Sequence, residues 1–528
     1  MARRPAGADR RRHGRDHEGD HRQDIRAVKA TLFSGCKPEV AAGPDGRILA
    51  AGAKARSAAG RGAEVVRLRG TAWPGLMDSH IHLEGLAEKH LQLDLTGTRS
   101  LEAALRHVER WSSRLPRSAW VLGAGWYNDL WPDPRFPTRQ HLDRAAGGRP
   151  VYLSRKDGHS AWASSAALRA AGIDRDFADP PGGVIDRDER GEPTGILREL
   201  AMDVVERRLP LPTDAEFDAA MTRALAALVR FGLTGVHSMD TARGFGSLQR
   251  LHARGKLPLR VTYNLPLADL RHAERMGVRS GWGDSWLRFW GVKAFLDGSL
   301  GSRTAEMLDG TGTPRLSQAD LIDMIERCVR AELNVCLHAI GDAAVRRALD
   351  ALVPRRHAWS HWRPRIEHAQ CVHPKDWRRF AAAGAIASMQ PIHAVADREL
   401  ADATWRDVTA NAYAWRALEK AGARLAFGSD APVETADPML GIEAATTWRR
   451  QARWHPDLAV SRASALRAYT SDAAYAAGME DVAGALKPGL FCDVTVVEDG
   501  RVTATVVGGK VRWRRPAAAS RRSGSGAR

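Results

Sequence analysis

The chain has 528 residues, 44% hydrophobic residues and five scattered cysteines, so its composition is that of a globular protein without a disulfide framework. Its net charge of +17 suggests a nucleic-acid partner, but more than half of that excess lies in residues 1–28 and 512–528 and the rest is spread thinly. No apolar run reaches the ~18 residues that cross a bilayer. We therefore expect a cytoplasmic protein with neither a nucleic-acid nor a membrane partner.

Short strands separated by turns are predicted near both ends of the chain. Residues 29–72 and 484–513 contain apolar and polar residues that alternate with period two around turn sequences. Neither end has enough strands to bury a core alone, so we expect one small β-sandwich domain built from both. The flanking residues, 1–28 and 514–528, are predicted to be a disordered basic arm and a disordered basic tail.

Residues 73–483 alternate apolar β-runs with helices, which predicts an α/β fold. Eight strands are expected in the stretches 73–83, 232–240, 259–265, 291–297, 334–342, 365–370, 385–391 and 425–430. A helix over 317–333, with Ser317 as N-cap, is an example of the helices between them. Eight such units predict a TIM (β/α)8 barrel.

The stretch 100–212 follows the first predicted strand and is too long for one crossover connection. We expect it to be an insertion with its own helix over 100–115 and Gly/Pro-rich loops. Because it follows the carboxyl end of a barrel strand, it is predicted to lie over the barrel mouth.

Residues with metal-binding chemistry stand at or near the carboxyl ends of five predicted strands, where a barrel brings side chains together. They are His80, His82, Lys293, His338, His368 and Asp430. Taken singly, each has an ordinary explanation as a buried histidine, a surface lysine or a helix N-cap. Four imidazoles and a carboxylate converging on one point instead favour a divalent metal site, with ligands suited to zinc.

Lys293 fits such a site only if carbon dioxide carbamylates its amine, which turns a repelled cation into an anionic ligand. A carbamate bridges two metals as a carboxylate does, so we expect two zinc ions per chain. Two metals that share a water lower its pKa and supply hydroxide at neutral pH. Asp430 would then be both a metal ligand and the catalytic group that moves the proton to the leaving amine.

Several stretches, read together, resemble the amidohydrolase superfamily, and specifically the amidohydrolase family 3 branch of N-substituted formamide deformylase-like proteins. They include PGLMDSHIHL, VKAFLDGSLGSRTA, LHAIGDAAV, RIEHAQ and AFGSDAPV, and the similarity spans roughly residues 30–513. The resemblance implies a metal-dependent hydrolase of non-peptide C–N bonds, such as an N-substituted formamide, and implies ligand roles for the same six residues. Ser164 departs from the usual Asn of such proteins, which leaves substrate contacts open.

Six further residues are candidate substrate contacts, each with a plainer alternative: Trp126, Asp157, His159, Asp297, Arg303 and Gln390. Asp157 and His159 suit loop capping equally well, and packing of the insertion is favoured for Trp126. Asp297 and Arg303 follow Lys293 in a Gly-rich loop, where they orient the ligands or hold the loop. Gln390 and His393 follow the seventh strand and are expected to face the mouth.

Other functions stay open on the same residues. The machinery would also open a cyclic amide or lactone, or deaminate a heterocycle. A non-catalytic binding protein is disfavoured because every ligand position is filled, and nucleic-acid association would depend on the basic arm and tail. The expected partner is a small amide-type molecule, and a homodimer is one candidate assembly.

Overall fold

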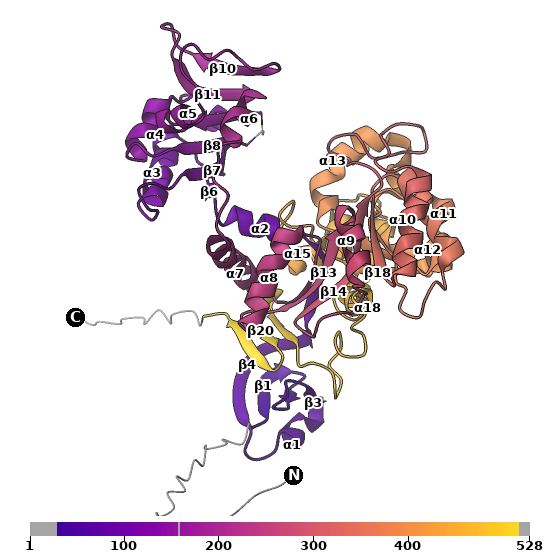
Figure 1. Cartoon of the computed structure of the whole chain (residues 1–528). Coiled ribbons are helices and arrows are strands. Elements are labelled where there is room, and N and C mark those ends of the chain that lie inside the picture. The colour runs from indigo at the N-terminus through magenta and orange to yellow at the C-terminus, as the bar shows by residue number, and fades with distance from the viewer. Residues whose placement is uncertain (1–28, 157–158, 517–528) are drawn as a thin grey trace, which may run out of the picture.

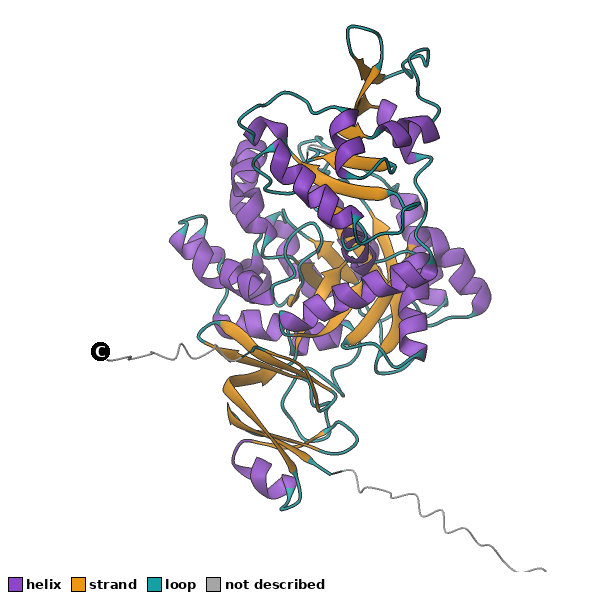
Figure 2. Cartoon of the chain, turned by 90° about the vertical axis from the view of Figure 1, so that its left-hand side faces the viewer, coloured by secondary structure: helices purple, strands orange, loops and turns teal. Residues whose placement is uncertain are grey.

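The computed structural model describes residues 29–156 and 159–516, which fold into a barrel, a small sheet domain and an inserted lobe (Figures 1 and 2). The predicted basic arm and most of the predicted tail lie outside the described residues, although Arg514 of the tail ends a strand. Asp157 also lies outside them. The described residues include no helix long and apolar enough to cross a bilayer.

Eight parallel strands form the barrel, in the order β18-β17-β16-β15-β14-β13-β12-β5. Their bounds are β5 (Leu76–Ile81), β12 (Leu233–Ser238), β13 (Arg260–Pro266), β14 (Leu287–Phe295), β15 (Asn334–Ala339), β16 (Arg365–His368), β17 (Ile386–Met389) and β18 (Arg424–Phe427). Backbone bonds join the ends of the first and last strands, from Asp430 N–H to His80 O (2.7 Å) and from His82 N–H to Ala431 O (2.8 Å). The predicted barrel is confirmed, with its strands in the predicted order.

Helices on the outside of the barrel cover the strands and supply the other half of its core. They include α7 (Asp214–Arg230), α8 (Ala242–Ala253), α9 (Leu270–Met276), α10 (Gln318–Arg330), α11 (Asp342–Leu352), α12 (Trp377–Ala383), α13 (His393–Trp405) and α14 (Trp415–Lys420). α10 is the helix predicted over 317–333, and the hydroxyl of Ser317 caps it by accepting the N–H of Asp320. Its buried residues recur at the spacing of one helix face.

The two ends of the chain form one small sheet domain, as predicted. It contains β1 (Thr31–Lys37), β2 (Val40–Ala42), β3 (Ile48–Ala51), β4 (Glu64–Pro74), β19 (Val494–Glu498), β20 (Arg501–Val507) and β21 (Lys510–Arg514). All seven strands are hydrogen-bonded in a single order, β21-β20-β19-β4-β1-β2-β3. A buried ion pair between Arg260 Nε and Asp493 Oδ2 (2.7 Å) fastens this domain to the start of barrel strand β13.

The insertion is a lobe with a sheet of its own, which Figure 1 shows apart from the barrel. Its strands are β6 (Leu93–Asp94), β7 (Val121–Trp126), β8 (Val151–Arg155), β9 (Ser160–Ala163), β10 (Gly183–Arg187) and β11 (Pro193–Glu199). Its helices are α3 (Leu101–Ser112), α4 (Arg139–Ala145), α5 (Ser165–Ala170) and α6 (Ala201–Glu206). α3 is the predicted helix, whereas the sheet replaces the loops that we expected. The position of the lobe over the barrel mouth stays a prediction.

Candidate metal centre

The closure of the barrel brings the first and last strand ends into contact. The carboxylate of Asp78 accepts the N–H groups of His80 and Ser429, both at 3.0 Å, and so ties the two ends together. Gly428 permits this approach, because a Cβ there would lie 2.5 Å from the backbone nitrogen of His80. Asp430 is thereby held beside the histidines of β5.

Predicted ligands from three strand ends meet at this point. One ligand atom each from His80, His368 and Asp430 lies within 4.8 Å of the others, and all three residues are buried. Asp430 Oδ1 is 3.0 Å from His82 Nε2 and 3.4 Å from His80 Nε2. The ring of His368 is 4.8 Å from that of His80 and 4.5 Å from that of His338, centroid to centroid.

Hydrogen bonds to the protein leave one nitrogen of each of three imidazoles free to accept. His80 Nδ1 lies 2.6 Å from Glu367 Oε2, and His82 Nδ1 lies 3.2 Å from the carbonyl oxygen of Met239. His338 Nε2 lies 2.8 Å from the carbonyl oxygen of Gly298. Each of these oxygens can only accept, so the ring nitrogen facing it carries the hydrogen. The lone pair is therefore on Nε2 of His80 and His82 and on Nδ1 of His338, as a metal requires.

Burial favours the neutral form of the imidazoles of His80, His338 and His368. It lowers the pKa of His80 to about 4 and that of His338 to about 3, and it lowers the pKa of His368 well below its ordinary value. Burial also lowers the pKa of Lys293, so that its amine loses the proton more readily than an exposed lysine does. Neutral imidazoles are metal ligands, whereas imidazolium ions are not.

Buried atoms at the centre lack hydrogen-bond partners within the described ranges. They are His80 Nε2, Lys293 Nζ, His338 Nδ1 and His368 Nδ1. Acceptor nitrogens that face the carboxylate of Asp430 repel it unless a positive charge lies between them. The donor set of nitrogen and carboxylate oxygen therefore fits a divalent metal ion of the zinc type.

A buried ion pair lies beside the predicted ligands inside the barrel. Arg365 Nε is 2.7 Å from Glu367 Oε1, and neither side chain is exposed. Arg365 also donates to His237 Nδ1 at 2.9 Å and to Ser388 Oγ at 2.9 Å. Burial alone would raise the pKa of Glu367, but the charge of Arg365 and the bond to His80 together outweigh it and hold that pKa below its usual range. Glu367 is thus an anion that orients His80.

Two of the predicted ligands have left-handed backbone conformations, with φ of 70° at His368 and 60° at Asp430. Side chains alternate between the two faces of a regular strand, so the neighbours Glu367 and His368 would point in opposite directions. The left-handed residue ends β16 and turns His368 toward the mouth while Glu367 stays in the barrel. Such conformations are costly outside glycine and concentrate at functional sites.

Two of the weaker candidates are buried near the ligands and one is exposed. Asp297 accepts the backbone N–H groups of Gly341 (2.9 Å) and Glu306 (3.0 Å), so it holds the loops around His338. Gln390 is buried and donates to the carbonyl oxygen of Ser388 at 3.2 Å. Arg303 is exposed on the loop after β14.

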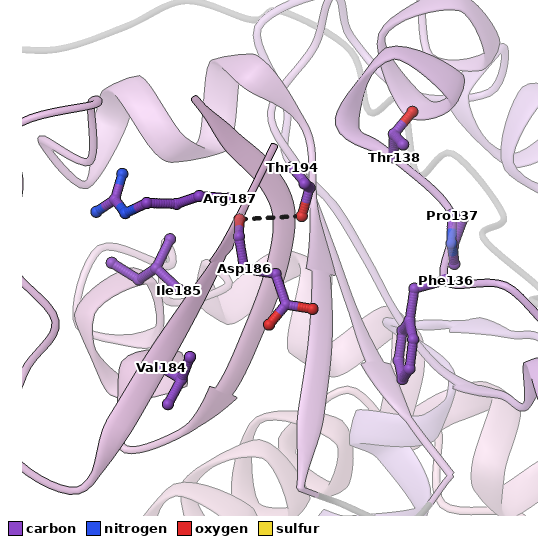
Figure 3. Close-up of a pocket in the computed structure, with 8 residues that line it drawn as sticks. All are labelled: Phe136, Pro137, Thr138, Val184, Ile185, Asp186, Arg187 and Thr194. Carbon is purple, nitrogen blue, oxygen red and sulfur yellow. Dashed lines mark hydrogen bonds between the residues drawn. The ribbon is translucent and has the colours of Figure 1, made fainter. Parts of the chain in front are cut away.

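Two other candidates belong to the insertion. Trp126 is fully buried in its core, where Nε1 donates to the carbonyl oxygen of Leu153 at 2.8 Å, which matches the packing alternative. His159 is exposed and pairs with Glu199 at 3.1 Å. A cavity of about 390 Å³ on this lobe lies between β10 and the segment 136–138, and none of the six predicted ligands lines it (Figure 3).

Sequence reasoning missed the residues that contact the predicted ligands. Arg365 and Glu367 stand two residues apart in a strand that is otherwise read as buried, and two opposite charges on one face of such a strand are a signal of an internal ion pair. Gln370, which follows β16, lies 3.3 Å from His393 (Nε2 to Nδ1). Nothing in the sequence pattern marks that contact.

The fold and the centre together define a barrel hydrolase of the metal-dependent class, and comparisons with known proteins agree. The family described as Amidohydrolase family matches residues 65–511. A metal-dependent hydrolase from Pyrococcus furiosus superposes with a TM-score of 0.72 at 29% identity, over 90% of this chain and 98% of its own. The chain therefore belongs to the Amidohydrolase family, as the sequence motifs indicated.

Two curated relatives extend this similarity along the chain. The Bacillus subtilis protein YtcJ is 34% identical over 72% of this chain and 74% of its own length. The N-substituted formamide deformylase of Arthrobacter pascens is 28% identical over 86% of this chain and 88% of its own. Membership in this family makes the protein a hydrolase that acts on carbon–nitrogen bonds.

Proposed function

We propose that the protein hydrolyses a small N-substituted formamide or a related amide with two zinc ions per chain. The observation that carries this proposal is the cluster of buried, partnerless ligand atoms around Asp430. His80, His82, His338, His368 and Asp430 would hold the ions, with Lys293 between them. Such ions lower the pKa of a water to near neutrality and polarise a carbonyl group. The formamide class is taken from the relative in Arthrobacter pascens.

Lys293 would act as a carbamate. The neutral amine attacks carbon dioxide, a nitrogen–carbon bond forms, and one proton is released to solvent. Its burial and lowered pKa favour the neutral amine that this step needs. The product is an anionic group with two oxygens, which suits a position between two cations better than an ammonium does.

Asp430 would move the proton. Burial alone would raise its pKa, but the neighbouring imidazoles of His82 and His80 hold that pKa below the usual range, so it is a carboxylate that can accept. It takes a proton from the attacking water and returns it to the nitrogen as the C–N bond breaks. One water is consumed, and a carboxylic acid and an amine are produced.

Metal content is the measurement that tests this proposal. Elemental analysis of the purified protein should give close to two zinc-like ions per chain, and a variant with His80→Asn and His82→Asn should lose them together with amide hydrolysis. About one ion per chain would be consistent with amide hydrolysis but would contradict the proposed role of Lys293 as a carbamate between two ions. No metal under metal-replete, bicarbonate-containing conditions would overturn the mechanism.

A substrate panel tests the reaction. Formamides should be hydrolysed faster than lactams, lactones or purine-like rings, and the reverse order would favour ring opening or deamination on the same residues.

We also propose a cytoplasmic protein, with a homodimer as the assembly to test, that does not bind nucleic acid. Removal of residues 1–28 and 517–528 should leave hydrolysis intact, and loss of hydrolysis would show that the ends are needed.

A further inference from the structure

His393 is a buried histidine beside Asp430 to which no role has yet been given. It is the first residue of α13, and only 8% of its side chain is exposed. Its Nε2 atom lies 3.8 Å from Asp430 Oδ2. Its ring lies 6.3 Å from that of His368, centroid to centroid, with 21° between the ring planes. The side chain therefore borders the metal centre from the side of strand β17.

Gln370 sets which nitrogen of His393 carries the hydrogen. The side-chain nitrogen of Gln370 lies 3.3 Å from His393 Nδ1, and an amide nitrogen can only donate. Nδ1 is therefore the acceptor, and the hydrogen of the neutral ring is on Nε2, on the side of Asp430. No described residue accepts that hydrogen.

This tautomer distinguishes His393 from the ligands. A ring nitrogen that carries hydrogen has no lone pair for a metal, so His393 Nε2 is a donor next to the centre. At 3.8 Å the Asp430 carboxylate is beyond hydrogen-bond distance, which leaves the N–H uncommitted. The group in need of a donor at this place is the carbonyl oxygen of an amide, which becomes negative when water attacks.

We propose that His393 is a catalytic residue whose Nε2–H donates a hydrogen bond to the carbonyl oxygen of the substrate, and that Gln370 is the positioning residue that holds it in the required tautomer. This inference rests on the proposed amide hydrolysis. A bond of this kind strengthens as negative charge develops on the oxygen, so its main effect is on kcat rather than on KM.

Two variants of His393 separate a donor from a space-filling ring. His393→Phe keeps a ring and removes the donor, so kcat for formamide hydrolysis should fall roughly 100- to 1000-fold while KM changes less than about threefold. His393→Gln places an amide N–H near the position of Nε2 and should retain activity within about tenfold of wild type. Metal content should stay that of wild type in both. His252→Phe, the same substitution on the outer helix α8, is the matched control.

Methylphosphonate, a tetrahedral oxyanion, gives a readout that does not depend on turnover. Calorimetry on the metal-loaded protein should show about tenfold weaker binding to His393→Phe than to wild type, with His393→Gln between them. Equal binding and equal kcat in wild type and His393→Phe would overturn the proposal. If wild type hydrolyses no amide, the proposed function fails, and methylphosphonate binding alone decides whether His393 is an oxyanion donor.

Gln370→Met keeps the proposal testable if His393→Phe does not fold. It removes the donor to His393 Nδ1 without removing the imidazole, which is then free to adopt either tautomer. A fall in kcat smaller than that of His393→Phe, with unchanged metal content, supports the positioning role. No fall in kcat would overturn the role of Gln370.

Discussion

The insertion and the barrel mouth both bury polar side chains, but they differ in whether those side chains find partners. In the insertion, Nε1 of Trp131 and of Trp162 donates to a backbone carbonyl oxygen, at 3.1 and 3.0 Å, as Trp126 does. Of the described residues between 93 and 206, only Ser112 has a buried side-chain atom without a partner. At the mouth, partnerless atoms occur on His80, Lys293, His338, His368, Gln370, Gln390 and His393.

This difference separates a scaffold from a binding site. Each buried polar atom without a partner costs about 1–3 kcal/mol, so folding alone does not favour a cluster of them. In the described part of the insertion, nearly all buried polar side-chain atoms have hydrogen-bond partners, so its fold needs no bound ligand to satisfy them. The mouth retains hydrogen-bonding and ligand capacity that only an ion or a small molecule can use.

Lys293→Met is the change with the largest expected effect. It should lower the rate of hydrolysis but not the free energy of unfolding. Hydrolysis should fall roughly a thousandfold, since several kcal/mol of transition-state stabilisation depend on the metals. The free energy of unfolding of the metal-free protein should not fall, because an apolar side chain of similar length replaces a buried amine without a partner. Kinetics measures the first quantity, and urea denaturation after chelation measures the second.

Unchanged hydrolysis in Lys293→Met would remove Lys293 from the reaction. A loss of more than about 2 kcal/mol in the metal-free protein would mean that the mouth uses this amine to hold the fold, and the contrast with the insertion would then disappear.

Glu367→Gln has the next largest expected effect. It keeps the shape of the side chain, removes the anion that orients His80, and leaves Arg365 buried without its counter-charge. Metal affinity should fall about 10- to 100-fold, and unfolding should become easier by about 3–5 kcal/mol. Competition with a chelator measures the first quantity and urea denaturation the second.

Glu206→Gln is the control for that change. Glu206 is an exposed residue of the insertion that accepts the hydroxyl of Tyr152 at 2.7 Å. Its substitution should leave metal affinity unchanged. Equal losses of affinity in the two variants would show that the effect is not specific to the mouth.

Trp126→Phe has the smallest expected effect on catalysis. It removes the hydrogen bond from Nε1–H to the carbonyl oxygen of Leu153 in the core of the insertion, which should cost about 1 kcal/mol of stability. Thermal denaturation measures this loss. Metal content and kcat should equal those of wild type, and a change in either would mean that the insertion takes part in the reaction.

The barrel was predictable because hydrophobic periodicity is a local property. Each of the eight apolar runs is readable by itself, and parallel strands must present their carboxyl ends at one face. Residues at those ends, such as His80 and Asp430, could therefore be assigned to one site without knowledge of any distance. The insertion sheet was missed because its strands mix parallel and antiparallel pairs, so no single repeat of strand and helix marks them along the chain.

The sequence by itself determined the barrel, the small domain shared by the two ends, and the residue types available at the mouth. The tertiary structure decided which atoms of those residues have hydrogen-bond partners within the protein. The tautomers of His80 and His393 depend on Glu367 and Gln370, which reach them from strand β16 and the loop after it. Such contacts depend on side-chain directions and on the left-handed turn at His368, to within fractions of an ångström, and no periodic pattern in a chain encodes them.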